Sequence, residues 1–155
     1  MDNRTLADPG TAAFQVDKYP FFLLNRLVSR YNVVVESRLK PLSLDIPYWR
    51  VLMILGERAP RGVADIAAAA VIPLSTMTRI IQRMSADGLV SVKASKADAR
   101  VSEVSLRAAG RAKLEAAREV TAPIFRTIIK GVDRQDFDKL LWLLDHLHTN
   151  LEMID

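Results

Sequence analysis

Hydrophobic residues recur every three or four positions over several long stretches of the chain, which is the spacing of amphipathic helices. The pattern predicts a first helix over 19–40, ended by Pro41, and a second that begins after Pro47 and stops near Arg58. An alanine-rich segment, 63–70, predicts a short third helix. The chain is therefore expected to be mainly helical.

The pattern changes character after Pro73. An amphipathic helix begins there and ends at Gly88, a residue that readily adopts the left-handed conformation closing a helix. Two short hydrophobic segments, 89–92 and 101–106, predict strands on either side of a charged loop. Two short helices joined by a tight turn and followed by a β-ribbon have the geometry of a winged helix-turn-helix, whose second helix enters the major groove of DNA.

The C-terminal part of the chain returns to helical spacing. A long helix is expected from Ala108, with Pro123 kinking it or ending its first segment. The last helix is predicted to begin after Asp133, a suitable N-cap, and it carries a leucine-rich stripe almost to the end of the chain. This stripe is either ordinary core or the contact surface of a homodimer. Its extent favours the dimer, because the end of a monomer would fray and because two heads bind DNA more tightly than one.

These elements predict a mainly α fold with a small β-wing, in which N- and C-terminal dimerisation helices flank a winged helix-turn-helix head. A chain of 155 residues that is 50% hydrophobic is large enough to form a substantial core. The expected organisation is an irregular N-terminal arm (1–17), a dimerisation helix with its connection (18–46), the DNA-binding head (47–107) and C-terminal dimerisation helices (108–155).

Basic charge is concentrated in the predicted head. Segment 73–113 contains eight Lys and Arg residues against three Asp and Glu residues, a net charge of +5. Because the whole chain carries +4, the remainder carries −1. The positive charge therefore lies where contact with DNA phosphates is predicted.

The helix after Pro73 has an apolar side and a polar side. Hydroxyl side chains near a helix N-terminus suit phosphate and base-edge contacts, and an arginine can bridge guanine O6 and N7. A pair of solvated arginines would show the same spacing, but the β-ribbon that follows favours DNA contact. The residues predicted to contact DNA from this helix are Ser75, Thr76, Thr78, Arg79, Gln82 and Arg83.

The loop KASKADAR between the predicted strands supplies the remaining predicted DNA contacts. Arg100, in a projecting loop, suits insertion into a narrow minor groove, and Lys96 adds a second positive charge. Asp98 would repel DNA if it were unpaired. We therefore expect it to pair with an arginine of the head and to support the wing.

Aromatic residues crowd the first two predicted helices together with two arginines. One interpretation is an aromatic core between the head and the dimerisation helices. The other is a pocket for an aromatic or acidic small ligand, with rings that bury the ligand and an arginine that binds its carboxylate. The predicted ligand-binding residues are Phe22, Arg26 as the carboxylate partner, and Trp49 as the stacking surface.

Several function classes are excluded by residue content. The absence of cysteine rules out disulfides, Cys-ligated zinc and thiol redox sensing. His146 and His148 lie ~200° apart on a helix, so they cannot share a metal on one face. The chain shows no nucleophile–base pair, phosphate loop or paired carboxylates, so we expect no enzyme, metal or cofactor. It shows neither a secretory signal nor an apolar run of ~20 residues, so we expect a cytoplasmic protein without membrane contact.

From about Phe21 to Leu151 the sequence resembles the MarR family of bacterial transcription regulators. The strongest parts are PYWRVLMIL, STMTRIIQRMSADGLV and LRAAGRAKL. The family often shows T-R-x-x-x-R-L-x-x-x-G-L-V followed by D-x-R in the wing. The matching positions here are Thr78, Arg79, Arg83, Met84, Gly88, Leu89 and Val90, then Asp98 and Arg100.

Two features depart from the family pattern. Pro73 stands where a Ser or Thr cap is common, and Val101 and Ser102 stand where a second acidic residue and an arginine often follow. The resemblance implies a homodimer that binds a pseudo-palindromic operator, usually as a repressor, and often releases it when a small phenolic or aromatic acid binds. The alternative is a winged-helix protein-interaction module without sequence-specific DNA readout, whose exposed face should favour apolar and aromatic residues.

Overall fold

The computed structural model describes residues 2–154. Its contacts divide the chain into two compact units, Met1–Ala122 and Pro123–Asp155. The structure is mainly helical with one small antiparallel sheet, which confirms the predicted fold class. The finer division into an arm, a head and dimerisation helices stays a prediction.

The N-terminal arm contains two short regular elements that the sequence pattern did not predict. Helix α1 spans Asn3–Ala7, and the 3-10 turn η1 spans Val16–Lys18. The Asp2 carboxylate caps α1 by accepting the backbone N–H of Arg4 at 2.9 Å. A single helical turn shows no hydrophobic periodicity, so the sequence pattern could not reveal it.

The first two predicted helices are confirmed, with ends within two residues of those expected. Helix α2 spans Pro20–Leu39 and continues into the 3-10 turn η2, Lys40–Leu42. Helix α3 spans Ile46–Glu57. The Asp45 carboxylate caps α3 by accepting the backbone N–H of Tyr48 at 2.8 Å, which fixes where the helix begins.

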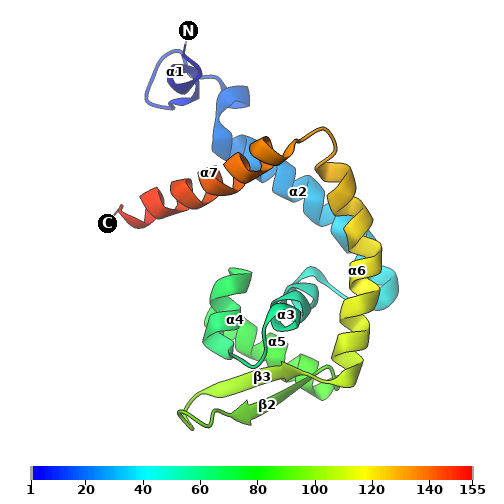
Figure 1. The fold of residues 1–155 in the computed structure, drawn as a ribbon. Coiled ribbons are helices and arrows are strands. Elements are labelled where there is room, and N and C mark those ends of the chain that lie inside the picture. The colour runs from blue at the N-terminus through cyan, green and yellow to red at the C-terminus, as the bar shows by residue number, and fades with distance from the viewer. Residues whose placement is uncertain (1, 155) are drawn as a thin grey trace. The chain divides into compact units, whose positions relative to one another are not determined.

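Helices α4 (Val63–Ala70) and α5 (Leu74–Ala86) form the predicted helix-turn-helix. They meet at a bend of 111°, within the roughly 90–120° of this motif. Val71 adopts the left-handed conformation in the turn, and Gly88 adopts it after α5, as predicted for Gly88. Both helices pack against α3 (Figure 1).

A three-stranded antiparallel sheet in the order β1-β3-β2 completes the head. The predicted strands are β2 (Val90–Ala94) and β3 (Ser102–Leu106). They pair along their whole length, from Val90 opposite Leu106 to Ala94 opposite Ser102. Strand β1, Arg61–Gly62, pairs with β3 and leads directly into α4. It was not predicted, because two residues are too few to show alternation.

The core of the head is built from apolar residues of every surrounding element. The predicted apolar side of α5 is buried, with Met77, Ile80, Ile81 and Met84 at most 3% exposed. Burial of each such side chain stabilises the fold by about 1.5–3 kcal/mol, so it fixes which side of α5 faces outward. Fully buried residues from the other elements include Leu39, Leu52, Ile66, Val90 and Val104.

Helix α6 spans Ala108–Ile128 and does not end at Pro123. Of the two predicted effects of this proline, a kink or the end of the first segment, the structure excludes the second. Helix α7 spans Arg134–Glu152 and begins as predicted, since the Asp133 carboxylate accepts the backbone N–H of Asp136 at 2.8 Å. None of the described residues of α7 is buried.

No single helix within residues 2–154 is long and apolar enough to cross a membrane. Helices α4 and α5 meet those criteria only when they are combined across their bend. Within the same residues, no three or more His, Asp or Glu side chains gather where they could hold a metal ion.

Candidate nucleic-acid interface

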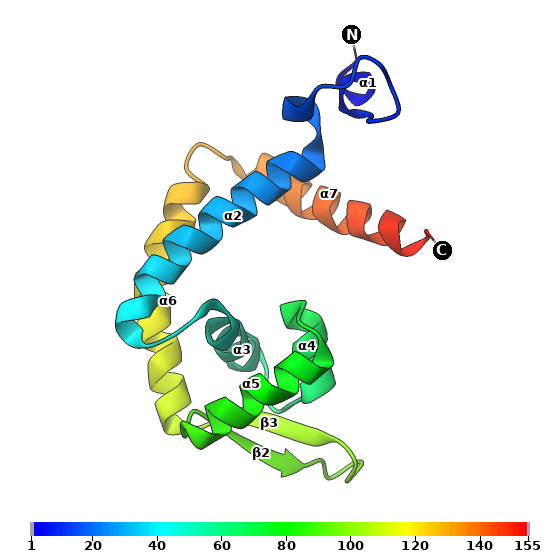
Figure 2. The same ribbon diagram turned by 180° about the vertical axis from the view of Figure 1, so that it is seen from behind.

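Helix α5 presents a polar face to the outside of the head, alongside the β2–β3 ribbon (Figure 2). The buried side of the helix holds it in this orientation. The structure brings all the predicted contacts of this helix to the surface. The exposed residues are Ser75, Thr76, Thr78, Arg79, Gln82 and Arg83.

The start of α5 reflects the departure at Pro73. This residue occupies the N-cap and supplies no side-chain hydrogen bond to the helix. The first backbone N–H groups of α5 have no carbonyl within the helix to bind, and they carry the positive end of the helix dipole. They can therefore donate hydrogen bonds to a phosphate oxygen, in the place that a Ser or Thr cap would otherwise take.

Thr78 is partly committed to its own helix. Its hydroxyl donates to the carbonyl oxygen of Leu74 at 2.9 Å. The lone pairs of the hydroxyl oxygen stay available. A contact from Thr78 would therefore accept a hydrogen bond, for example from a base amino group.

Arg83 is held by a side chain that sequence reasoning did not connect with DNA binding. Its guanidinium carbon lies 5.6 Å from the ring centroid of Tyr48, within the range of a cation–π contact. The Tyr48 hydroxyl donates to Asp87 Oδ2 at 3.0 Å. No local spacing in the sequence signals this group, because Tyr48 and Asp87 are 39 residues apart.

The wing is the loop between β2 and β3, and two backbone hydrogen bonds and one from a backbone N–H to a side chain shape it. Ser95 donates its N–H to Val101 O at 2.8 Å, and Val101 donates to Asp98 O at 2.9 Å. The Ser95 hydroxyl accepts the N–H of Ala97 at 3.2 Å. Ser95 is buried and was missed by the sequence reasoning, which looked for charge in this loop.

Asp98 pairs with Arg100 inside the wing itself. The carboxylate accepts the Arg100 backbone N–H at 3.0 Å and Nε at 3.2 Å. The Arg100 side chain, and then its backbone N–H, hold the pKa of Asp98 below its usual value. The guanidinium remains exposed, as does Lys96, so both basic side chains are placed at the surface of the wing.

The predicted ligand-binding residues lie in different environments. Phe22 is 48% exposed and contacts Tyr19 edge to face, while Arg26 is exposed on the same helix. Trp49 is buried in the head, only 5% exposed. The structure therefore does not enclose Phe22 and Arg26 in one cavity with Trp49.

Among residues 2–154, two buried side-chain polar atoms have no hydrogen-bond partner. They are Trp49 Nε1, a donor, and Asn32 Oδ1, an acceptor. Buried polar groups are nearly always satisfied, so each calls for a partner of the opposite kind. Arg50 lies nearby on α3 and acts on Tyr31, whose pKa is raised by burial and lowered to a lesser extent by this guanidinium. Arg50 is one of the two arginines that the sequence places among these aromatic residues, although only Arg26 was chosen as the carboxylate partner; Asn32 was not singled out.

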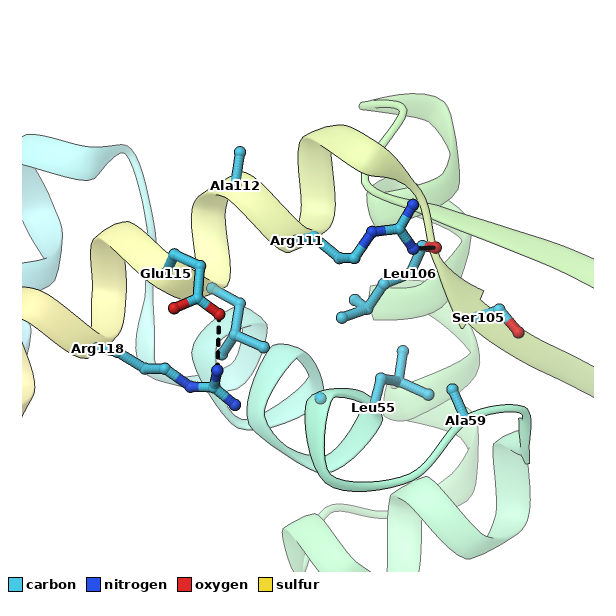
Figure 3. A pocket seen from close by; sticks show the side chains of 10 residues that line it. Leu55, Ala59, Ser105, Leu106, Arg111, Ala112, Glu115 and Arg118 are labelled. Atoms are coloured by element: carbon cyan, nitrogen blue, oxygen red, sulfur yellow. Dashed lines mark hydrogen bonds and ion pairs between the residues drawn. The ribbon is translucent and has the colours of Figure 1, made fainter.

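A pocket of about 580 Å³ lies among α3, β3 and the start of α6 (Figure 3). Its apolar lining includes Leu55 and Leu106. Both guanidiniums at its edge are already engaged: Arg111 Nη1 donates to Leu106 O at 2.9 Å, and Arg118 Nη1 pairs with Glu115 at 2.6 Å. This is a packing groove, since both guanidiniums already have hydrogen-bond or ion-pair partners.

Comparison with known proteins points to one family. A family model described as MarR family matches residues 42–101. The chain is 36% identical over 147 residues to the HTH-type transcriptional repressor IacR of Pseudomonas putida, covering 95% of this chain and 88% of that protein.

Solved structures agree with this assignment. A MarR-family transcriptional regulator from Silicibacter pomeroyi superposes with a TM-score of 0.82 at 26% identity, covering 94% of this chain and 98% of that one. BpsR of Bordetella bronchiseptica, whose DNA binding is regulated by 6-hydroxynicotinic acid, superposes with a TM-score of 0.70 at 24% identity. That match covers 81% of this chain and 96% of BpsR.

These relatives are transcription regulators rather than enzymes. Their likeness extends over nearly the whole chain and includes the helix-turn-helix and the wing described above. The chain belongs to the MarR family of DNA-binding transcription regulators.

Proposed function

We propose that this protein is a homodimeric repressor that binds a pseudo-palindromic operator and is released from it by a small aromatic or phenolic ligand. The observation that carries the proposal is the outward polar face of α5 beside a basic wing. That face consists of hydroxyls, an amide and two arginines, and its opposite side is locked into the core. A protein-interaction face would favour apolar and aromatic side chains instead.

The DNA contacts divide by the part of the duplex that each residue reaches. In the major groove, Arg79 is the candidate for a guanine, and the wing's Arg100 is the candidate for the minor groove. Arg83 and Lys96 are candidates for phosphates, which position the protein without reading sequence. The remaining proposed contacts are Ser75, Thr76, Thr78 and Gln82, and Asp98 supports the wing.

The homodimer is supported by exposed apolar side chains in each unit. In the first unit, Leu27 and Val28 of α2 are 55% and 48% exposed. In the second unit, Leu141 and Leu144 of α7 are 52% and 40% exposed. Contiguous apolar surface of this kind marks a protein–protein contact, and a two-fold dimer would present two heads to an inverted repeat.

The ligand is supported by the unpartnered polar atoms of the first unit. An aromatic acid offers an acceptor for Trp49 Nε1 and a ring that packs in apolar surroundings. Arg26, with Phe22 one turn away, is the carboxylate partner proposed from the sequence, and Arg50 is a second candidate. Regulation of BpsR by 6-hydroxynicotinic acid gives the chemical class.

The experiment begins with a duplex selected by the protein from a random-sequence library. We expect an inverted repeat with half-sites about one helical turn, ~10 bp, apart, and an affinity that falls steeply with salt. Binding is then measured with a panel of aromatic acids. A ligand that binds the free form better should weaken operator binding by roughly 5–150-fold.

Arg26→Ala and Arg50→Ala are compared in the same assay. Substitution of the arginine that binds the carboxylate should reduce the response to the acid, while operator binding in the absence of the acid stays unchanged. Selection of a single half-site by a monomer would contradict the dimer. An unchanged response in either variant would remove that arginine from the ligand site.

A further inference from the structure

Tyr48 connects helix α3 to the end of α5, the helix proposed to face DNA. It lies in the first turn of α3 and is 9% exposed. The Asp45 carboxylate holds its backbone N–H at 2.8 Å, so its place is fixed by the helix cap. The hydroxyl donates to Asp87 Oδ2 at 3.0 Å, and Asp87 is the C-cap residue of α5.

The face of this tyrosine ring carries Arg83. The guanidinium carbon lies 5.6 Å from the ring centroid, and the side chain is otherwise at the surface. An arginine has many rotamers, and ordering it for a contact costs conformational entropy. A ring that holds the guanidinium before DNA arrives removes part of that cost.

Burial raises the pKa of the Tyr48 hydroxyl, and the hydrogen bond to Asp87 raises it further. The hydroxyl therefore keeps its proton at neutral pH and remains the donor to Asp87. This hydrogen bond anchors the ring, and the ring in turn anchors Arg83.

We propose that Tyr48 is a positioning residue for DNA binding, which holds Arg83 in place on α5 through its ring and is itself held by Asp45 and Asp87. The proposal rests on the proposed function, in which Arg83 contacts DNA. It adds a residue that does not touch DNA and that no exposed-surface criterion would select.

A double-mutant cycle tests the proposal on the full-length protein and its selected operator duplex. Tyr48→Leu removes the ring, and we expect operator binding to weaken about 3–10-fold, the cost of ordering one rotamer-rich side chain on binding. Tyr48→Phe keeps the ring, which the Asp45 cap and burial still hold, but loses the hydrogen bond to Asp87, so its affinity should lie between those of the wild type and of Tyr48→Leu. In an Arg83→Ala background, Tyr48→Leu should cause no further loss of affinity.

Thermal unfolding is measured for every variant, because Tyr48 also contributes to the core. We expect Tyr48→Leu to lower Tm in both backgrounds, somewhat less where Arg83 is already absent, so the loss common to both backgrounds measures its structural role. An equal loss of affinity in both backgrounds would overturn the proposal. Unchanged affinity in Tyr48→Leu alone would do so as well.

A spectroscopic measurement keeps the test decisive if Tyr48→Leu fails to fold. In NMR spectra of the wild type and of Tyr48→Phe, the Arg83 side-chain protons should carry an upfield ring-current shift. Absence of that shift would overturn the proposal. Should the wild type fail to bind any duplex, or Arg83→Ala bind as the wild type does, the proposed DNA contact would fail instead of the role of Tyr48.

Discussion

At the scale of single residues, the three arginines of the interface differ in how they are held. Arg83 rests on the Tyr48 ring, and Arg100 is tied to Asp98 within its own loop. Arg79 projects from the exposed middle of α5. Recognition of a base in the major groove needs a side chain that is free to reach the base edge, as Arg79 is. An arginine that is already held in place, such as Arg83 or Arg100, suits a contact at a fixed position, with a phosphate or in the minor groove.

The difference between Arg79 and Arg100 can be tested by comparing base preferences. Arg79→Ala should cost roughly 1–3 kcal/mol and relax the preference at one base pair, if the guanidinium reads guanine. Arg100→Ala should weaken binding and alter A·T preference beside the wing, with less change in the major groove. Affinities for a set of single-base operator variants measure both effects. If both variants bound these operators as the wild type does, the proposal that this surface contacts DNA would be refuted.

Much of the candidate interface could be predicted from the sequence because α5 is amphipathic. Burial of Met77 and Ile80 dictates that Arg79 faces outward, and periodicity alone gives this result. The residues that hold the interface side chains in place could not be predicted from the sequence. The contact between Arg83 and Tyr48 depends on tertiary packing, and the hydrogen bonds of Ser95 depend on loop geometry, neither of which has a periodic signature.

Val71 offers a residue-scale test of backbone strain. It is 86% exposed with φ of 55°, a conformation that a β-branched residue rarely adopts. Val71→Asn should stabilise the protein by about 1 kcal/mol, because asparagine tolerates this region far better. Thermal or urea unfolding measures the change. Val16→Asn, at an exposed position outside the positive-φ residues, is the control, and an equal gain there would show that strain is not the cause.

At the scale of elements, the long helices were predictable and the short pieces were not. Twelve or more residues of helical spacing in α2, α3 and α7 gave their types and nearly their ends. The five residues of α1 and the two of β1 carry no such signal. Their formation depends on the Asp2 cap and on pairing with β3, which sequence spacing does not encode.

The junction of α6 with the head gives an element-scale prediction at Gly110. This buried glycine lies where an added Cβ would collide with the carbonyl oxygen of Leu89, which accepts the Arg107 N–H at 2.9 Å. Gly110→Ala should therefore destabilise the protein by about 1–3 kcal/mol or more, measured by urea unfolding. Backbone cannot move aside without breaking that hydrogen bond.

Gly56→Ala is the matched control within helix α3. Its Cβ would collide with Leu114 Cδ2, the far end of a flexible side chain that can change rotamer. Better helix propensity, up to about 1 kcal/mol, offsets part of the cost. We therefore expect a smaller loss than for Gly110→Ala. Equal losses for the two variants would show that backbone contact is not the deciding factor.

At the scale of the whole molecule, the proposed dimer depends on helices that leave apolar residues exposed. The leucine stripe of α7 could be read from sequence either as core or as a contact between copies. In the structure Leu140, Leu144 and Leu147 are 39–45% exposed, and none of the described residues of α7 is buried. An ordinary core would bury these side chains, so the stripe is the surface on which we place the second copy.

Leu144→Asp tests this placement. The substitution puts a charge on an exposed part of the stripe, so a monomer should keep its fold, while a dimer would have to bury an unpaired carboxylate. We expect light scattering to show a dimer for the wild type and a monomer for the variant at micromolar concentration. Operator affinity should fall when the dimer is lost, because the second head no longer benefits from a high effective concentration, a factor on the order of 100 or more. Thr149→Asp, at an exposed position turned away from Leu144 on α7, is the control and should remain a dimer with its affinity intact. A monomeric wild type would refute the contact surface, and a monomeric variant with full operator affinity would refute the dependence of DNA binding on the dimer.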